Sequence, residues 1–345
     1  MKKNYFKNKK ILITGATGTI GSAIIFDFIK NYDFKVIRAM SNDENGLFQL
    51  SQNIKPQTSN LHKMMKSNKI RLIYGDIRNY NRCLEATEDI DIVIHAAAMK
   101  HVPICEYNPD EAIETNIIGT KNICKASIKN KIEKLLFIST DKAVDPQSIM
   151  GVTKLAGEKI VLNANDVASI KKKIFYCIRF GNVIGSRGSV IEVFKDQINN
   201  NKNLTVTNKN MTRFFMDIEL AAKKIINSLQ ICRGGEIFII KAMKTFKIFD
   251  LAETLINYYK KKIKINITGV RENEKLSEVL LSSYEMQFAI ENKEFLIINK
   301  DYDIKSNINY YSGQKLSKFE YTSSKRKKMI SKTEILNYLK KKKII

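Results

Sequence analysis

The stretch KILITGATGTIG, residues 10–21, decides the fold. It opens with the short apolar run KILIT (10–14) and closes with three glycines, Gly15, Gly18 and Gly21. Glycines at this spacing permit a tight turn and let the backbone approach a pyrophosphate, which is attracted by free N–H groups at the start of the next helix. Because a strand is predicted before the glycines and a helix after them, the motif indicates a dinucleotide-binding unit.

Outward from this motif, short apolar runs alternate with helix-length segments. The predicted strands are 10–14, 34–40, 70–76, 90–97, 134–140 and 174–181, and the predicted crossover helices are 19–30, 109–130 and 150–164. Continuous apolar strands joined by amphipathic helices are typical of a parallel sheet that is covered on both faces. We therefore predict an α/β fold, a Rossmann-like doubly wound parallel sheet with a smaller α+β substrate-binding lobe.

Beyond residue 181 the elements become shorter and richer in charge. Helices are expected near 189–199 and 218–230, and strands at 204–207, 236–241, 264–270 and 294–300. This pattern predicts a dinucleotide-binding domain over 1–181, to which 215–242 returns, and a substrate-binding lobe with a C-terminal arm over 182–214 and 243–345. Residues 301–330 are polar and predict a loop or extended arm. Ser331 and Glu334 are placed to form a capping box at the start of a last helix.

Composition narrows the classes of function. The net charge is +24, but the lysines are scattered and no nucleic-acid-binding motif accompanies them, so a solvated basic surface is favoured over a nucleic-acid partner. No apolar run reaches the ~18 residues of a membrane span, and the N-terminus is no signal peptide. The five cysteines lack CxxC spacing and the three histidines lack ligand partners, which indicates reduced thiols, no metal and a cytoplasmic protein.

The residues after the second and third strands bear on the choice of cofactor. The second strand ends in MSNDE (40–44), with no acid directly at its end, and Arg38 is the only arginine nearby. NAD and NADP therefore both stay open. Asp76, at the end of the third strand, is a candidate acceptor for the adenine amino group, and a simple strand-end turn is the alternative reading.

Six further motifs carry a resemblance that spans almost the whole chain. They are IHAAAMKHVP (94–103), TNIIGTKN (115–122), STDKAVDPQSIMGVTK (139–154), RFGNVIGSRGSV (179–190), MTRFFM (211–216) and GVRENEKLSE (269–278). With them the chain resembles the UDP-N-acetylglucosamine 4,6-dehydratases, extended short-chain dehydrogenases of surface-polysaccharide and nonulosonic-acid synthesis. The resemblance implies a UDP-sugar substrate, a tightly bound NADP or NAD that is regenerated in each turnover, and a homo-oligomer.

The resemblance also implies a reaction and residues to perform it. A hydride leaves sugar carbon 4 for the nicotinamide, a base removes the carbon-5 proton, an acid protonates the departing 6-hydroxyl, and the hydride returns to carbon 6. The implied catalytic residues are Lys142 as the base, Asp141 as the acid, and Thr140. The implied cofactor-binding residues are Gly15, Thr17, Gly18, Thr19, Ile20, Gly21, Ser41, Asp76, Ile77, Ala96, Lys100, Ser139, Met150, Lys154 and Val183. The implied substrate-binding residues are Lys100, His101, Asn182, Arg187, Val190, Arg213, Arg271 and Glu274.

One position departs from the wider superfamily. Short-chain dehydrogenases normally carry Tyr-x-x-x-Lys, whereas this chain has Met150 four residues before Lys154. A thioether cannot exchange a proton, so Lys142, Thr140 or water must deprotonate the carbon-4 hydroxyl. A general-base lysine needs a lowered pKa and a general-acid aspartate a raised one, and both are expected of this pair. The alternatives are a nucleotide-sugar 4-epimerase and a non-catalytic nucleotide-binding protein.

Overall fold

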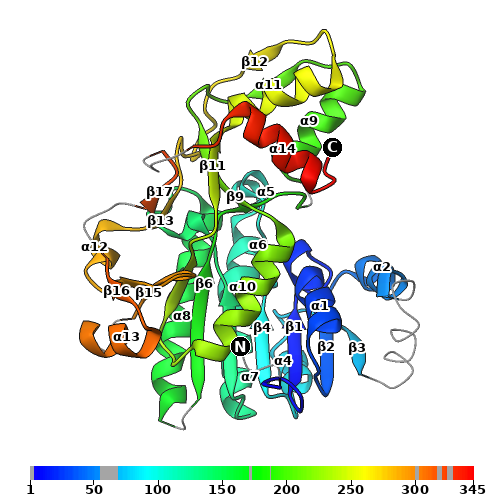
Figure 1. Cartoon of the computed structure of the whole chain (residues 1–345). Coiled ribbons are helices and arrows are strands. Elements are labelled where there is room, and N and C mark those ends of the chain that lie inside the picture. The colour runs from blue at the N-terminus through cyan, green and yellow to red at the C-terminus, as the bar shows by residue number, and fades with distance from the viewer. Residues whose placement is uncertain are drawn as a thin grey trace.

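The computed structural model describes residues 4–54, 69–170, 173–186, 188–299, 303–316, 321–324 and 329–345. Its main feature is a ten-stranded sheet in the order β16-β14-β15-β10-β6-β5-β4-β1-β2-β3 (Figure 1). Seven strands run parallel, namely β1 (Lys10–Thr14), β2 (Val36–Ser41), β3 (Ile70–Tyr74), β4 (Ile92–His95), β5 (Lys134–Ile138), β6 (Ile174–Arg179) and β10 (Ile237–Ile240). The order 3-2-1-4-5-6 within them is that of a doubly wound fold, so the predicted fold class is confirmed.

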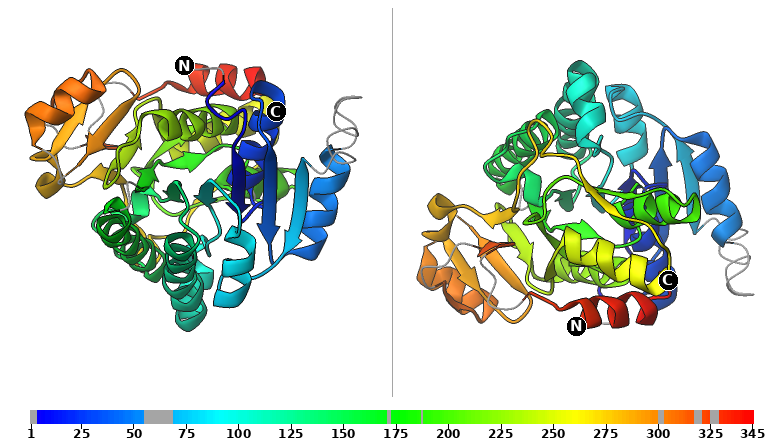
Figure 2. Two further views of the ribbon diagram at one scale, coloured as in Figure 1. Left: turned by 90° about the horizontal axis from the view of Figure 1, so that it is seen from below. Right: turned by 90° about the horizontal axis from the view of Figure 1, so that it is seen from above.

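Helices cover both faces of this sheet, as the left view of Figure 2 shows. On one face α1 (Thr19–Asn31) packs against α10 (Ile218–Ile231), and on the other α7 (Gly119–Lys129) lies between α4 (Tyr80–Thr87) and α8 (Ile149–Ser169). The strands in between are almost wholly buried, and β5 has no exposed residue. This double cover explains why the strands are apolar on both faces and could be recognised as continuous apolar runs.

A smaller lobe lies over the carboxyl ends of the parallel strands (Figure 1). Its elements are β7 (Asn182–Val183), α9 (Val190–Asn199), β8 (Leu204–Val206), β9 (Thr212–Met216), β11 (Lys244–Lys247), α11 (Ile248–Tyr259), β12 (Ile265–Ile267) and α14 (Lys332–Lys341). A second hydrophobic core holds them together, with Phe194, Phe246 and Leu255 fully or almost fully buried and Leu339 of α14 joining them. The capping box of Ser331 and Glu334 at the start of α14 is present as predicted.

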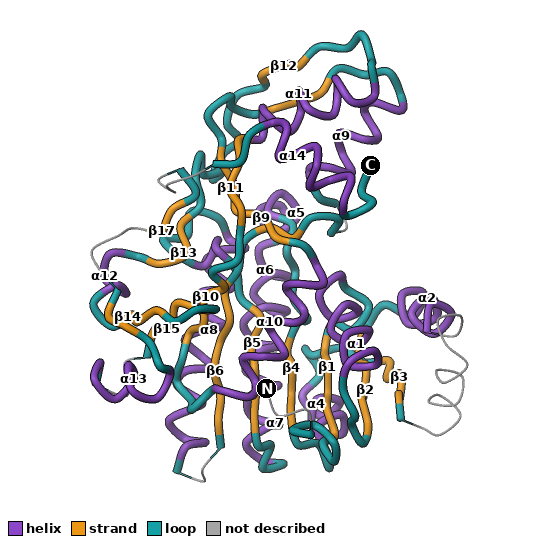
Figure 3. The backbone as a smooth tube through the Cα atoms, viewed as in Figure 1, coloured by secondary structure: helices purple, strands orange, loops and turns teal. Residues whose placement is uncertain are grey.

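The segment after this lobe returns to the main sheet. Strands β15 (Phe295–Ile298), β14 (Ala289–Glu291) and β16 (Gln314–Lys315) extend it antiparallel beyond β10 (Figure 3). From the sequence, this segment is expected in the smaller lobe. Instead, β15 is entirely buried and pairs with β10. Without β15, the apolar strand β10 would form an unpaired edge of the sheet.

The polar stretch expected to form a loop or arm over 301–330 differs from that expectation where it is described. It contains α13 (Ile304–Tyr311), which is capped by Asp303 and buries only Asn307 and Tyr311. A helix that hides so little of its surface carries a weak apolar signal. No helix in the described parts of the chain is long and apolar enough to cross a membrane.

The remaining elements connect these parts. They are α2 (Glu44–Ile54), α5 (Val102–Tyr107), α6 (Pro109–Ile113), the π-helical turn η1 (Glu114–Ile118), the 3-10 turn η2 (Asp141–Ala143), α12 (Ser283–Met286), and the paired strands β13 (Val279–Leu281) and β17 (Tyr321–Thr322). A buried ion triad ties α12 to the sheet. Arg179, at the end of β6, forms bidentate bonds of 2.7 Å to Glu158 of α8 and of 2.8 and 2.9 Å to Glu285 of α12.

Candidate active site

The glycine loop joins β1 to α1 and leaves room for a ligand. Gly15 has a left-handed backbone (φ 66°), and a Cβ there would lie 2.6 Å from the Ala97 backbone nitrogen. A Cβ on Gly21 would lie 2.3 Å from the Gly15 carbonyl oxygen. Gly18 is the N-cap residue of α1. Because glycine has no side chain, the cap residue provides no hydrogen-bond acceptor to the first N–H groups of the helix. The loop therefore fits the pyrophosphate of a dinucleotide.

The ends of β2 and β3 form the next part of the site. Asp76 accepts hydrogen bonds from Arg78 at 2.7 Å and from Asn42 at 3.2 Å. Burial raises the pKa of the Asp76 carboxyl, but the Arg78 hydrogen bonds outweigh it and the net pKa is lowered. Arg38, the arginine noted above near the end of β2, donates to the Ala86 carbonyl at 2.9 Å.

One cavity of about 960 Å³ runs from the glycine loop to the smaller lobe. Its lining includes nearly every site residue expected from the sequence, namely Gly15, Thr17, Gly18, Thr19, Ile20, Gly21, Ser41, Asp76, Ile77, Ala96, Lys100, His101, Ser139, Thr140, Lys142, Met150, Lys154, Asn182, Val183, Val190, Arg213, Arg271 and Glu274. Asp141 does not line it, because its side chain is fully buried behind Thr140 and Lys142. Arg187 lies outside the described residues.

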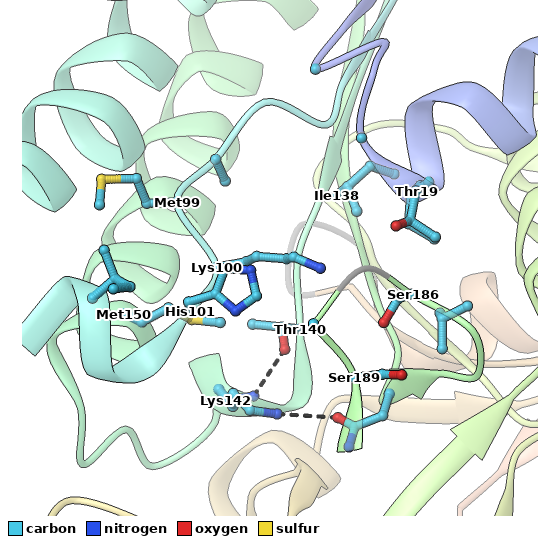
Figure 4. A pocket seen from close by; sticks show the side chains of 18 of the residues that line it. Thr19, Met99, Lys100, His101, Ile138, Thr140, Lys142, Met150, Ser186 and Ser189 are labelled. Atoms are coloured by element: carbon cyan, nitrogen blue, oxygen red, sulfur yellow. Dashed lines mark hydrogen bonds between the residues drawn. The ribbon is translucent and has the colours of Figure 1, made fainter. Parts of the chain in front are cut away.

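The reaction centre predicted from STDKA lies at the end of β5. Lys142 Nζ donates to Asp141 Oδ1 at 2.9 Å, and Thr140 Oγ1 donates to the same oxygen at 2.8 Å. Lys142 Nζ also donates to Asn182 Oδ1 at 3.4 Å (Figure 4). Figure 4 shows Lys100 and His101 above this cluster and Met150 beside it, around the same hollow. The 3-10 turn η2 fixes the geometry, because Thr140 caps it through the Lys142 backbone N–H.

The pKa of Asp141 is shifted in the expected direction, and the pKa of Lys142 is not. Burial raises the pKa of Asp141, and the nearby Glu278 carboxylate adds to the rise, as a proton donor requires. Burial lowers the pKa of Lys142, but Asp141 and Glu278 outweigh it, so the net pKa is raised and not lowered. The expected lowered pKa of Lys142 is therefore wrong for the free protein, because two carboxylates stabilise its ammonium form.

Met150 occupies the first turn of α8 and is almost fully buried against Cys105 and Ala112. Lys154, one turn later, donates to the Ile138 carbonyl at 2.6 Å. Burial lowers the pKa of Lys154 to about 8. The thioether thus replaces the usual hydroxyl with an apolar surface, while the lysine of the motif keeps its place beside the cavity.

The smaller lobe contributes residues that sequence reasoning missed. Val193, Phe194, Met211, Phe215 and Ile248 line the far end of the cavity. Most of them also belong to the hydrophobic core of the lobe, so their apolar pattern could not distinguish a ligand-contacting role from packing.

A second hollow of about 520 Å³ adjoins the first across Lys142. Arg213, Arg271 and Glu274 face both hollows, and Glu278 lines the second. Glu278 ends the quoted motif GVRENEKLSE, but sequence reasoning gave it no role. Its closeness to Lys142 is a long-range contact that sequence spacing cannot show.

The described residues contain no cluster of His, Cys, Asp and Glu side chains that could hold a metal ion. A family model for polysaccharide biosynthesis proteins matches residues 11–300 of this chain. The chain belongs to this polysaccharide biosynthesis family. The resemblance inferred from the six motifs is thereby confirmed.

Three known proteins are similar to this chain over most of its length. The UDP-N-acetylglucosamine 4,6-dehydratase (inverting) of Campylobacter jejuni is 37% identical over 343 residues, which cover 97% of this chain and 98% of that protein. A UDP-glucose 4-epimerase of Rickettsia bellii is 40% identical over 285 residues, or 81% of this chain and 80% of that one. The solved structure of Pen from Bacillus thuringiensis has a TM-score of 0.88 at 37% identity and covers 99% of both chains.

Proposed function

We propose that this family member catalyses the NAD(P)-dependent 4,6-dehydration of UDP-N-acetylglucosamine to a UDP-4-keto-6-deoxy-N-acetylhexosamine for surface polysaccharide or nonulosonic-acid synthesis. The observation that carries the proposal is the Asp141–Lys142 pair: Lys142 lines the cavity, and its Nζ lies 2.9 Å from the buried Asp141 carboxyl, whose pKa is raised. Elimination of water needs an acid and a base together, whereas epimerisation needs neither residue. The named relative from Campylobacter jejuni supports the substrate and inversion at carbon 5.

The glycine loop and the start of α1 would hold the cofactor diphosphate, and Lys154 would lie beside its ribose. When bound, a nicotinamide supplies the hydride acceptor for carbon 4 and the donor for carbon 6. Because the hydride returns to the same sugar, the cofactor is not consumed and is best retained tightly. All five cysteines are buried and unpaired, which supports a reducing, cytoplasmic setting.

The side chains of the reaction centre move two protons. Lys142, as the free amine, would take the carbon-5 proton. Asp141 reaches the cavity through Thr140, since their oxygens lie 2.8 Å apart. Once protonated, Asp141 can donate to the Thr140 oxygen, and the Thr140 hydroxyl can then donate to the departing 6-oxygen. Arg213 and Arg271, which also line the cavity, would bind the sugar diphosphate.

The decisive experiment incubates the purified protein with UDP-N-acetylglucosamine in heavy water and follows the product by mass spectrometry and NMR. We expect loss of one water, deuterium at carbon 5 and no stoichiometric use of added NAD(P). A product of unchanged mass with inverted carbon 4 would establish the epimerase alternative, which the Rickettsia relative favours. An unchanged sugar would contradict both enzyme hypotheses.

A further inference from the structure

Glu278 lies next to Lys142 although the two residues are far apart in the sequence. It directly precedes β13, and its backbone is fixed on both sides by Ser323, which follows β17. The Glu278 N–H donates to Ser323 Oγ at 2.9 Å, and the Ser323 N–H donates to the Glu278 carbonyl at 2.8 Å. The side chain is only 3% exposed. Two segments of the C-terminal part of the chain therefore fix the backbone of Glu278 beside the turn η2, which follows β5.

The Glu278 carboxylate lies between two cations. Its Oε1 is 3.4 Å from Lys142 Nζ and 3.5 Å from Arg213 Nε. Its Oε2 is buried without a hydrogen-bond partner among the described residues. A buried carboxylate with one free oxygen is costly to keep, so a carboxylate used only for stability would be expected to have both oxygens satisfied.

Asp141 and Glu278 compete for Lys142, but their surroundings differ. Arg213 pairs with Glu278, and Lys142, Arg213 and Lys275 together lower the pKa of Glu278 despite its burial. Burial and the Glu278 charge raise the pKa of Asp141. The charged groups around the cluster are Asp141, Lys142, Asp145, Arg213, Glu274, Lys275 and Glu278. Burial therefore favours the protonated form of Asp141, while the surrounding cations favour the carboxylate form of Glu278.

We propose that Glu278 is a positioning residue for Lys142: anchored by Arg213, its carboxylate holds the lysine at the cavity wall and stabilises the charge that Lys142 gains with the carbon-5 proton. This inference rests on the proposed dehydration. In the step concerned, the carbon-5 to hydrogen bond breaks, the proton joins Lys142 Nζ, and the electron pair passes into the enolate of the carbon-4 ketone. Glu278 acts on the lysine as a buried aspartate acts on a catalytic histidine.

Glu278→Gln tests this role because it keeps the shape and removes the charge. Only unprotonated Lys142 can accept the proton, so kcat rises with pH through the Lys142 pKa. Glu278 raises that pKa, and its loss should move the rise to lower pH by about one unit. We expect the plateau kcat to fall at least about 10-fold while KM changes by less than about 3-fold. Arg213 retains its bonds to the Thr212 and Leu276 carbonyls, which keeps KM near its original value.

Two variants complete the test. Glu291→Gln removes another lysine-paired glutamate, 2.7 Å from Lys241 at the edge of the sheet, and should leave kcat and its pH profile unchanged. Glu278→Asp keeps the charge on a shorter side chain, so it should lower kcat without moving the pH profile. If Glu278→Gln fails to fold, as judged by circular dichroism, the position of the profile in Glu278→Asp decides the matter.

Three results would overturn the proposal. They are a pH profile that does not move in Glu278→Gln, a kcat equal to that of Glu291→Gln, or a profile that shifts in Glu278→Asp. The unmodified protein tests the proposed function separately, since absence of dehydrated product there would refute the activity without any variant.

Discussion

The buried triad of Arg179, Glu158 and Glu285 should contribute strongly to stability. Arg179 is 1% exposed and Glu158 is fully buried, and four hydrogen bonds of 2.7 to 2.9 Å join the arginine to the two carboxylates. Arg179→Met would leave two carboxylates facing each other without a cation. Removing one partner of a buried pair costs about 3–5 kcal/mol, a large share of the roughly 5–15 kcal/mol that stabilises a typical domain.

Urea unfolding followed by circular dichroism measures this loss, since the chain has no tryptophan for fluorescence. The double variant Arg179→Met/Glu158→Leu is the control, because it removes the buried charge together with its partner. It should recover most of the lost stability. The reasoning would be refuted if Arg179→Met cost less than about 1 kcal/mol, or if the double variant were no more stable than the single one.

The penalty should also depend on pH. In the original protein the pKa of Glu285 is lowered, because the Arg179 hydrogen bonds outweigh burial. Its contribution to stability is therefore present above the unfolded pKa of about 4.3 and is lost only at lower pH. In Arg179→Met the folded-state pKa of Glu285 should rise, so its protonation relieves part of the penalty as the pH falls towards about 4.3. We expect a smaller difference in unfolding free energy at about pH 5 than at about pH 7.5, and an equal difference would contradict this account.

Two further predictions concern the active site. Gly21→Ala forces a Cβ to 2.3 Å from the Gly15 carbonyl oxygen and should weaken NAD(P) binding at least about 10-fold in calorimetry. In Gly18→Ala the nearest contact of the new Cβ is 3.2 Å, so the loss of affinity should be smaller. Equal affinities of the two variants would disprove the steric argument. Lys142→Ala should abolish dehydration while cofactor binding persists, and Met150→Leu should cost less than about 1.5 kcal/mol of transition-state stabilisation in kcat/KM. Near-normal product from Lys142→Ala would exclude it as the base.

The sequence was a good guide to the parallel part of the sheet and a poor one to the C-terminal part. Strands such as β1 and β5 are buried on both faces and are followed by long helices, so their apolar runs are clear. Strand β14 has three residues and β16 has two, which is too short for any periodicity to show. Helix α11 was not predicted although Leu251 and Leu255 mark its buried face, since lysines and short strands surround it in the sequence.

The candidate site divides in the same way. Gly15, Thr140, Lys142 and Met150 lie in short contiguous motifs at strand ends, where the topology itself brings them together. Glu278 comes within 3.4 Å of Lys142 although 136 positions separate them in the chain. Such a contact depends on how the segment after the smaller lobe folds back, and local patterns carry no information on that. The raised pKa of Lys142 results from Asp141 together with Glu278, and the second of these was missed for the same reason.

The pairing of Glu278 with Ser323 has a consequence for the order in which the charge cluster forms during translation. The glycine loop, β5 and the Asp141–Lys142 pair are made before Glu278 and Ser323. Ser323, which binds the backbone of Glu278, is made later than either Lys142 or Glu278. A growing chain therefore contains Lys142 before it contains the residues that surround it, and the charge cluster can form only after the segment around Ser323 has been made.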